Sequence, residues 1–88
     1  MKVTIIGKQY VKGSNDNGSY EYYKIYYTFV SPQAGFEGLM CESRNIYPSN
    51  EVFKDLPGVQ VNKLYDLDFT VVGKNVFVSS LTPVYGNK

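Results

Sequence analysis

The order of apolar and polar residues along the chain predicts a protein built mainly of β-strands. Short runs rich in Val, Ile, Tyr, Phe and Thr alternate with groups of Gly, Asn, Asp, Ser and Pro, as expected for strands separated by turns. We predict five strands, with a single helical turn between the third and the fourth. The strands are expected at residues 2–12, 20–30, 39–47, 63–72 and 76–82, and the helical turn within 48–58.

Residues typical of turns and helix ends support these boundaries. Asn17-Gly18 is a pair common in hairpin turns, so we expect the first two strands to form a long hairpin with a polar tip. In the helical turn, Ser49 suits the capping position before the first residue, and Pro57-Gly58 would end it.

Side chains alternate between the two faces of a strand, which sorts each strand into a core face and a solvent face. On the first strand, Val3 and Ile5 are expected in the core, although Ile6 breaks the alternation further on. On the fourth strand the apolar set is expected in the core and Asp66 and Asp68 on the other face. The apolar set of the fourth strand is Tyr65, Leu67, Phe69 and Val71.

The second strand is unusual because both of its faces carry tyrosine. Five of the nine tyrosines of the chain lie between Tyr20 and Tyr27. We assign the more apolar face to the core: Tyr23, Ile25, Tyr27 and Phe29. The face assigned to solvent then carries Tyr20, Tyr22, Lys24, Tyr26 and Thr28.

These elements predict an all-β domain that spans residues 1–88. Five short strands, one long hairpin and one helical turn suit a small, five-stranded, closed or half-closed barrel of the oligonucleotide-binding (OB) type. A small open sandwich is the alternative architecture. At 88 residues the chain has room for one core.

Composition removes several classes of function. The chain has no histidine and a single cysteine, so zinc sites of the Cys/His type, histidine-based triads and an internal disulfide are not expected. No apolar run has the length of a membrane span or a signal-peptide core, so we expect a cytoplasmic protein without a membrane partner. The formal net charge is +1, so binding of a polyanion would depend on local charge.

The solvent-facing row Tyr20, Tyr22, Lys24 and Tyr26 is the first candidate site. Single-stranded nucleic acid is bound without sequence preference where bases stack on aromatic rings and cations contact phosphates. Alternatively, the rings form cross-strand pairs that stiffen the sheet, or the face is buried in a homodimer.

Basic residues near this row form the second candidate. Residues 1–30 contain four lysines against two acids, and Lys8, Tyr10 and Lys12 precede the hairpin tip that Tyr20 and Tyr22 follow. Hairpin pairing is expected to bring Lys12 near Tyr20, although a solvated rim would look the same.

Two residues of the third strand complete the candidate set. Arg44, the single arginine, suits a phosphate or a base, or else a salt bridge. Tyr47 would extend the aromatic row or pack at the end of the strand.

No residues in this sequence form a convincing catalytic set, so an enzyme and a small-molecule substrate are not expected. Asp66 and Asp68 lie two apart on one strand but have no third ligand or base, so a solvated face explains them. Cys41 lacks a histidine to activate it and is expected to be a small buried residue. We expect no cofactor and no metal.

With these residues in view, the chain resembles the small single-stranded-DNA-binding proteins of filamentous bacteriophage and their relatives in other phages and conjugative elements. The resemblance lies in the stretches "MKVTI", "GSYEYYKIYYTFV" and "KLYDLDFTVVGKNVFVSSLTPV", and in total length. It implies an OB-type barrel, a symmetric homodimer, and cooperative, sequence-indifferent coating of single-stranded DNA during replication. The stacking positions that it implies are Tyr20, Tyr22, Tyr26 and, as a further one, Tyr47.

The sequence thus predicts a single-stranded-DNA-binding protein of a phage or mobile element, acting in the cytoplasm of a bacterial host. DNA-versus-RNA preference stays open. The alternative is a small adaptor whose tyrosine face docks on another protein or on a second copy. The predicted nucleic-acid-binding residues are Lys8, Tyr10, Lys12, Tyr20, Tyr22, Lys24, Tyr26, Arg44 and Tyr47.

Overall fold

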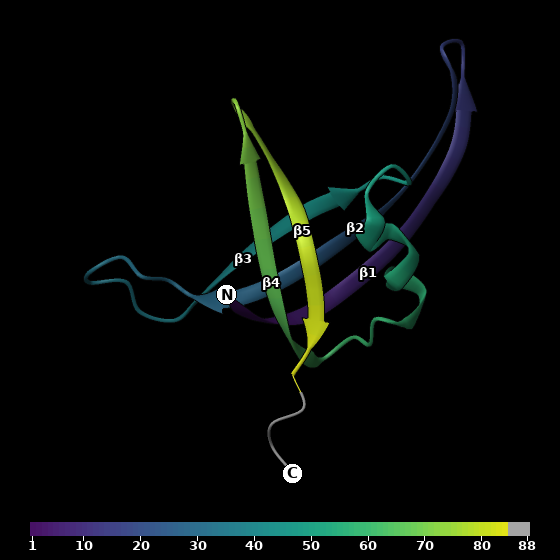
Figure 1. The fold of residues 1–88 in the computed structure, drawn as a ribbon. Helices are drawn as coiled ribbons and strands as arrows, with labels where there is room; N and C mark the ends of the chain where they lie inside the picture. Colours follow the sequence, from purple (N-terminus) through teal and green to yellow (C-terminus); the bar gives the residue numbers. More distant parts are fainter. Residues whose placement is uncertain (85–88) are drawn as a thin grey trace.

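The computed structural model describes residues 1–84, which form five antiparallel strands in one sheet and one short 3-10 helix, η1 (Figure 1). The strands lie in the order β3-β2-β1-β4-β5. The prediction of five strands with a helical turn between the third and fourth is confirmed. The elements are β1 (Lys2–Asn15), β2 (Gly18–Val30), β3 (Leu39–Ile46), η1 (Glu51–Gly58), β4 (Lys63–Val72) and β5 (Asn75–Pro83).

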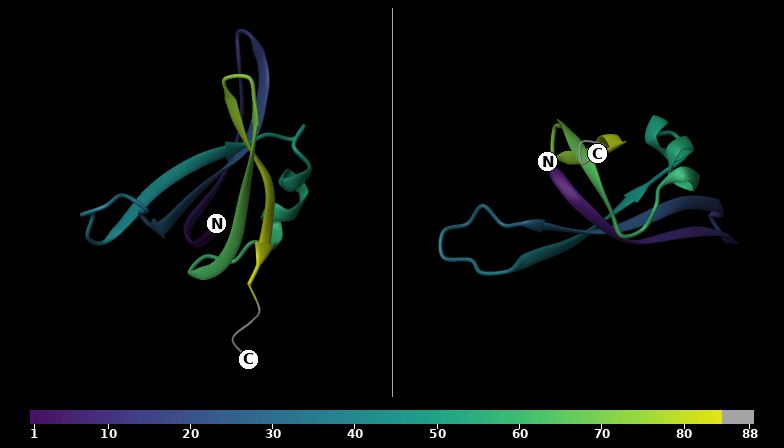
Figure 2. Two further views of the ribbon diagram at one scale, coloured as in Figure 1. Left: turned by 60° about the vertical axis from the view of Figure 1, so that its left-hand side comes forward. Right: turned by 90° about the horizontal axis from the view of Figure 1, so that it is seen from below.

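The core lies on one side of the layer formed by β1, β2 and β3. Figure 2 shows the β4–β5 hairpin and η1 on the same side of this layer, and residues 1–84 place no strand or helix on its other side. Ile25 and Tyr27 of β2 are fully buried against the core, and Tyr23 and Phe29 pack at its margin. The predicted core face of β2 is therefore confirmed.

Tyr27 is the one buried side chain of β2 that carries a polar group into this core. Its hydroxyl donates a hydrogen bond to Oε1 of Glu42 at 3.1 Å. Burial raises the pKa of Tyr27; the neighbouring Arg44 acts in the opposite direction, and Glu42 adds to the rise. The hydroxyl therefore stays protonated and serves as a donor.

The sheet is open, so the closed form of the predicted barrel is wrong. β3 and β5 are its edges, and they approach without exchanging ladder hydrogen bonds. Between them, η1 packs against β5, and Nδ2 of Asn50 donates a hydrogen bond to the carbonyl of Val78 at 2.8 Å. The Val78 carbonyl of β5 is thus bonded to Asn50, the residue that precedes η1. β3 ends at Ile46, before it reaches a position where it could pair with β5.

A β-bulge in β1 reverses the facing of its side chains. Before it, Ile5 pairs with Tyr27 in the core; after it, Gly7 pairs with Tyr26, so Ile6 has no cross-strand partner and is exposed. An extra residue shifts the two-residue alternation by one. Lys8 and the alternate residues that follow it therefore lie on the core side of the layer.

Lys8 uses this position to hold the end of η1. Its Nζ donates hydrogen bonds to the carbonyl oxygens of Leu56 at 2.9 Å, Pro57 at 3.3 Å and Val59 at 2.9 Å. A helix leaves its last carbonyls without partners inside the helix, and one ammonium group satisfies three acceptors around this end.

The other end of η1 is capped by Asn50, not by Ser49 as predicted. The Asn50 side chain accepts a hydrogen bond from the backbone N–H of Val52 at 2.9 Å. An amide can accept this bond while its NH₂ group bonds to β5, which the serine hydroxyl one residue earlier does not do. Val52 and Leu56 then face the core.

Both hairpins extend further than predicted. The β1–β2 turn consists of Asp16 and Asn17 alone, and the positive φ of 119° falls on Gly18, a value that glycine adopts without a clash. Most of the predicted polar tip is therefore strand. Val71 was expected in the core but is 66% exposed. It lies near the tip of the β4–β5 hairpin, which projects beyond the core.

We expect Lys8→Met to lower the free energy of unfolding by about 1.5–3 kcal/mol, because hydrogen bonds to a charged donor are lost. The carbonyls of Pro57 and Val59 then lose the Lys8 donor, while that of Leu56 keeps the backbone N–H of Val59. Urea denaturation measures this change. Lys54→Met, on the exposed side of η1, is the matched control and should stay within about 0.5 kcal/mol of the native protein. Equal stability of the two variants would contradict the role of Lys8.

Candidate nucleic-acid interface

The uncovered side of the β1–β2–β3 layer carries the tyrosine row of β2. We call this side the outer face. Cross-strand pairs place its residues in rows across the three strands, and Tyr47 follows directly after β3. The outer face includes Thr4, Gly7, Gln9, Val11, Gly13, Tyr20, Tyr22, Lys24, Tyr26, Thr28, Val30, Leu39, Cys41, Ser43, Asn45 and Tyr47.

Three of its rings form a continuous aromatic cluster. The ring centroids of Tyr20 and Tyr22 are 6.5 Å apart, and those of Tyr22 and Tyr47 are 5.5 Å apart. Tyr20 is 43% exposed and Tyr47 50% exposed, with Tyr22 half-buried between them. The cluster therefore presents ring surface to solvent at both of its ends.

Two glycines of β1 make room for rings of the outer face. A methyl group at Gly13 would lie 2.7 Å from Cζ of Tyr20, and one at Gly7 would lie 3.2 Å from Cδ1 of Tyr26. These rings lean across β1 at positions where any side chain would push them away. The side chain of Lys24 also lies over the ring of Tyr26, with Nζ 5.5 Å from the ring centroid.

A groove runs beside the aromatic cluster, where β2 continues past the end of β3. Its volume is about 440 Å³. Lys12 pairs directly with Glu21 across the hairpin, and its neighbour Gly13 pairs with Tyr20. Lys12 and Tyr20 both line this groove, as their expected proximity requires. The lining residues are Lys12, Ser19, Tyr20, Glu21, Tyr47 and Pro48.

By strand register, four predicted site residues lie on the core side of the layer and not on the outer face: Lys8, Tyr10, Lys12 and Arg44. Lys8 is bonded to the end of η1. Tyr10 donates a hydrogen bond to Glu21, and its ring centroid is 5.0 Å from that of Tyr23. Arg44 places its guanidinium 5.2 Å from the ring centroid of Phe69. The structure therefore does not bring Lys8, Tyr10 and Arg44 together with the tyrosine row, whereas Lys12 still lines the groove beside it.

The hydrogen bond from Tyr10 to Glu21 also affects ionisation. This bond raises the pKa of the Tyr10 hydroxyl above its ordinary value, with smaller contributions from partial burial and from the charge of Glu21. Tyr10 therefore remains a neutral donor, and its bond orients Glu21 on the core side of the hairpin.

The polar groups of the outer face include residues that the sequence did not single out. Gln9 and Asn45 lie on either side of Lys24 in one row. Nδ2 of Asn45 donates a hydrogen bond to the hydroxyl of Tyr47 at 3.3 Å. Nothing local marks these amides, because the register between the three strands is what places them beside the rings. Among the outer-face residues named above, Lys24 is the single charged side chain.

The structure also shows the surroundings of Cys41 and of the pair Asp66 and Asp68, for which the sequence predicted a buried thiol and a solvated face. Cys41 was expected to be buried, but it is exposed, because it lies on the outer face opposite Thr28. Asp66 and Asp68 each lie 3.6 Å from the α-amino group of Met1, so this carboxylate pair faces a cation. The N-terminus also donates a hydrogen bond to the carbonyl of Leu67.

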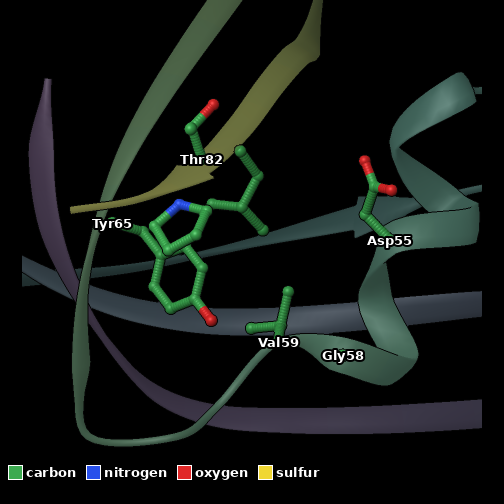
Figure 3. A pocket seen from close by; sticks show the side chains of 7 residues that line it. Asp55, Gly58, Val59, Tyr65 and Thr82 are labelled. Atoms are coloured by element: carbon green, nitrogen blue, oxygen red, sulfur yellow. The ribbon is translucent and has the colours of Figure 1, made fainter. Parts of the chain in front are cut away.

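A second hollow, of about 380 Å³, lies between η1 and the end of β5. Figure 3 shows Asp55 and Val59 on the helix side and Tyr65 and Thr82 on the strand side. The Tyr65 hydroxyl accepts a hydrogen bond from the backbone N–H of Gln60 at 2.9 Å. Asp55 and Thr82 are the polar side chains of its walls besides the bonded Tyr65, so the hollow offers little chemistry for a ligand.

Neither a metal cluster nor a membrane helix is found in the part of the chain that the structure describes. Within residues 1–84, no three His, Cys, Asp or Glu side chains are grouped so that they could hold a metal ion. The same residues include no helix that is long and apolar enough to span a membrane.

Comparison of the chain with models of protein families, with curated proteins and with solved structures finds no match in any of the three. The function of the outer face must therefore be inferred from its geometry.

We expect the thiol of Cys41 to react with an aromatic disulfide reagent in the native protein within about tenfold of its rate in urea-unfolded protein, because the thiol lies exposed on the outer face. The released thiolate is followed by absorbance. Protection of a thousandfold or more would mean that this face is covered, and would contradict its description as a free surface.

Proposed function

We propose that the protein binds single-stranded nucleic acid, and DNA in particular, on the outer face. The observation that supports this is the cluster of Tyr20, Tyr22 and Tyr47, which lies on a sheet face without a covering element. Each base that stacks on such a ring contributes about 1–3 kcal/mol and does so for any sequence. Three stacked bases would together contribute about 3–9 kcal/mol.

Electrostatic attraction plays a smaller part in this proposal. Lys8 and Arg44 have partners on the core side, which leaves Lys12 at the groove and Lys24 on the outer face as the nearby cations. For each phosphate of a single strand that a cation neutralises, the logarithm of the binding constant falls by about 0.7 for every tenfold increase in salt concentration. With at most two such contacts, the slope should be no steeper than about −1.5.

The wider proposal follows the resemblance found in the sequence. The sheet is interpreted as an OB-type barrel left open between β3 and β5, whose binding layer is β1–β2–β3. A homodimer that coats single strands cooperatively during replication of a phage or mobile element is the corresponding biological role. The near-neutral outer face favours coating by stacking over attraction by bulk charge.

A protein-docking role is the second candidate, and the same near-neutral charge favours it. Tyrosine is enriched among the residues that dominate protein interfaces, and the outer face carries a single charge. In this role the cluster would meet another protein or a second copy, and single-stranded DNA would not compete for it.

Substitution of matched tyrosines on the two faces tests the proposal. Tyr47 and Tyr10 are 50% and 46% exposed, but only Tyr47 belongs to the aromatic cluster. We expect Tyr47→Ala to weaken binding of a fluorescent thymidine oligonucleotide by roughly 5- to 150-fold, through loss of one stacked base. Tyr10→Ala should bind like the native protein. Fluorescence anisotropy at two salt concentrations measures affinity and slope together.

The absence of binding at low salt would remove the nucleic-acid proposal. Equal losses in the two variants would place the site elsewhere, and a slope much steeper than about −1.5 would show that lysine contacts outweigh stacking. Circular dichroism of both variants checks that the fold is retained.

A further inference from the structure

The single cation of the outer face is not placed like an ordinary phosphate contact. Lys24 lies in the middle of β2, half-buried, with its Nζ over the ring of Tyr26. It also lies in a three-strand row, with Gln9 of β1 on one side and Asn45 of β3 on the other. Lys12, in contrast, is exposed near the hairpin tip and is free to follow a backbone.

This row separates two aromatic positions. Tyr22 and Tyr26 lie two residues before and after Lys24, and a β-strand rises about 3.3 Å per residue. Their rows are therefore about 13 Å apart. A nucleic-acid strand that stacks on Tyr22 and continues along β2 brings its next base over Gln9, Lys24 and Asn45, where it meets polar groups and no ring.

The chemistry of the row favours particular base edges. An ammonium group donates hydrogen bonds and cannot accept them. Guanine, thymine and cytosine each carry a carbonyl oxygen, whereas adenine has none, and lysine is a common partner of guanine O6 and N7. Asn45 is oriented by its bond to Tyr47, so its Oδ1 remains able to accept from an amino or imino group of the same base.

We propose that Lys24, together with Gln9 and Asn45, contacts the edge of a base and not a phosphate, and that this position prefers a base with a carbonyl oxygen to adenine. The inference rests on the proposed function, because it concerns the same outer face. Binding is then weakly selective for bases that carry a carbonyl oxygen. The two lysines have different roles, since Lys12 contacts a phosphate and Lys24 contacts a base.

Two oligonucleotides separate this inference from simple stacking. One is an adenine pentamer, and the other is the same pentamer with a central guanine. Both are all-purine, so their stacking is closely matched, and no register of the first places a carbonyl oxygen over Lys24. We expect the native protein to bind the guanine-containing pentamer roughly fivefold or more tightly, measured by fluorescence anisotropy.

Variants of the two lysines then give opposite results. Lys24→Met keeps the apolar stem over Tyr26; it should bring the ratio of the two affinities close to one and leave the salt slope unchanged. Lys12→Met should keep the ratio and make the slope shallower. Lys24→Arg retains donors at this position and should keep the preference, which guards against a loss caused by misfolding.

Equal affinity of the native protein for the two pentamers would overturn the inference and leave the proposed function standing. A preference that survives in Lys24→Met, or a salt slope that falls in that variant, would likewise overturn the assignment of Lys24 to a base. Failure to bind either pentamer or a thymidine oligonucleotide at low salt would overturn the proposed function itself.

Discussion

The β-bulge at Ile6 is the constraint on which the arrangement of both faces depends. Because the alternation of β1 shifts by one residue there, Lys8 lies beneath the end of η1 while Gly7 lies under the ring of Tyr26. Without the shift, Lys8 would lie on the outer face and η1 would lose the cation that binds its terminal carbonyls. One extra residue thus fixes the helix and leaves the outer face with little charge.

The β1–β2 hairpin consequently carries aromatic rings on both sides, with different partners. On the core side, the rings of Tyr10, Tyr23 and Phe53 form a contact series that leads from the hairpin to η1. On the outer side, the contact between Tyr22 and Tyr47 joins β2 to the residue after β3, on the side of the layer where residues 1–84 place no further strand or helix. The first series links the hairpin to η1, and the second remains available for a ligand.

Much of this could be predicted from local pattern, and the remainder depends on pairing between strands. Period-two alternation identified the core face of β2 because apolar residues occupy it without interruption. It could not place Lys8, because the bulge is set by how β1 meets β2. The burial of Cys41 was predicted from residue type, yet the register of β3 puts it outside. Barrel closure failed for a similar reason, since the bond from Asn50 to β5 joins residues that are distant in the sequence.

The most direct test of the outer face as the binding surface is to record the aromatic NMR resonances of the tyrosines while a thymidine oligonucleotide is added. We expect the ring signals of Tyr20, Tyr22 and Tyr47 to shift and broaden together. Those of Tyr10, Tyr23 and Tyr27, on the core side, should change little. Shifts confined to the core-side rings, or none at all at saturating oligonucleotide, would contradict binding on the outer face.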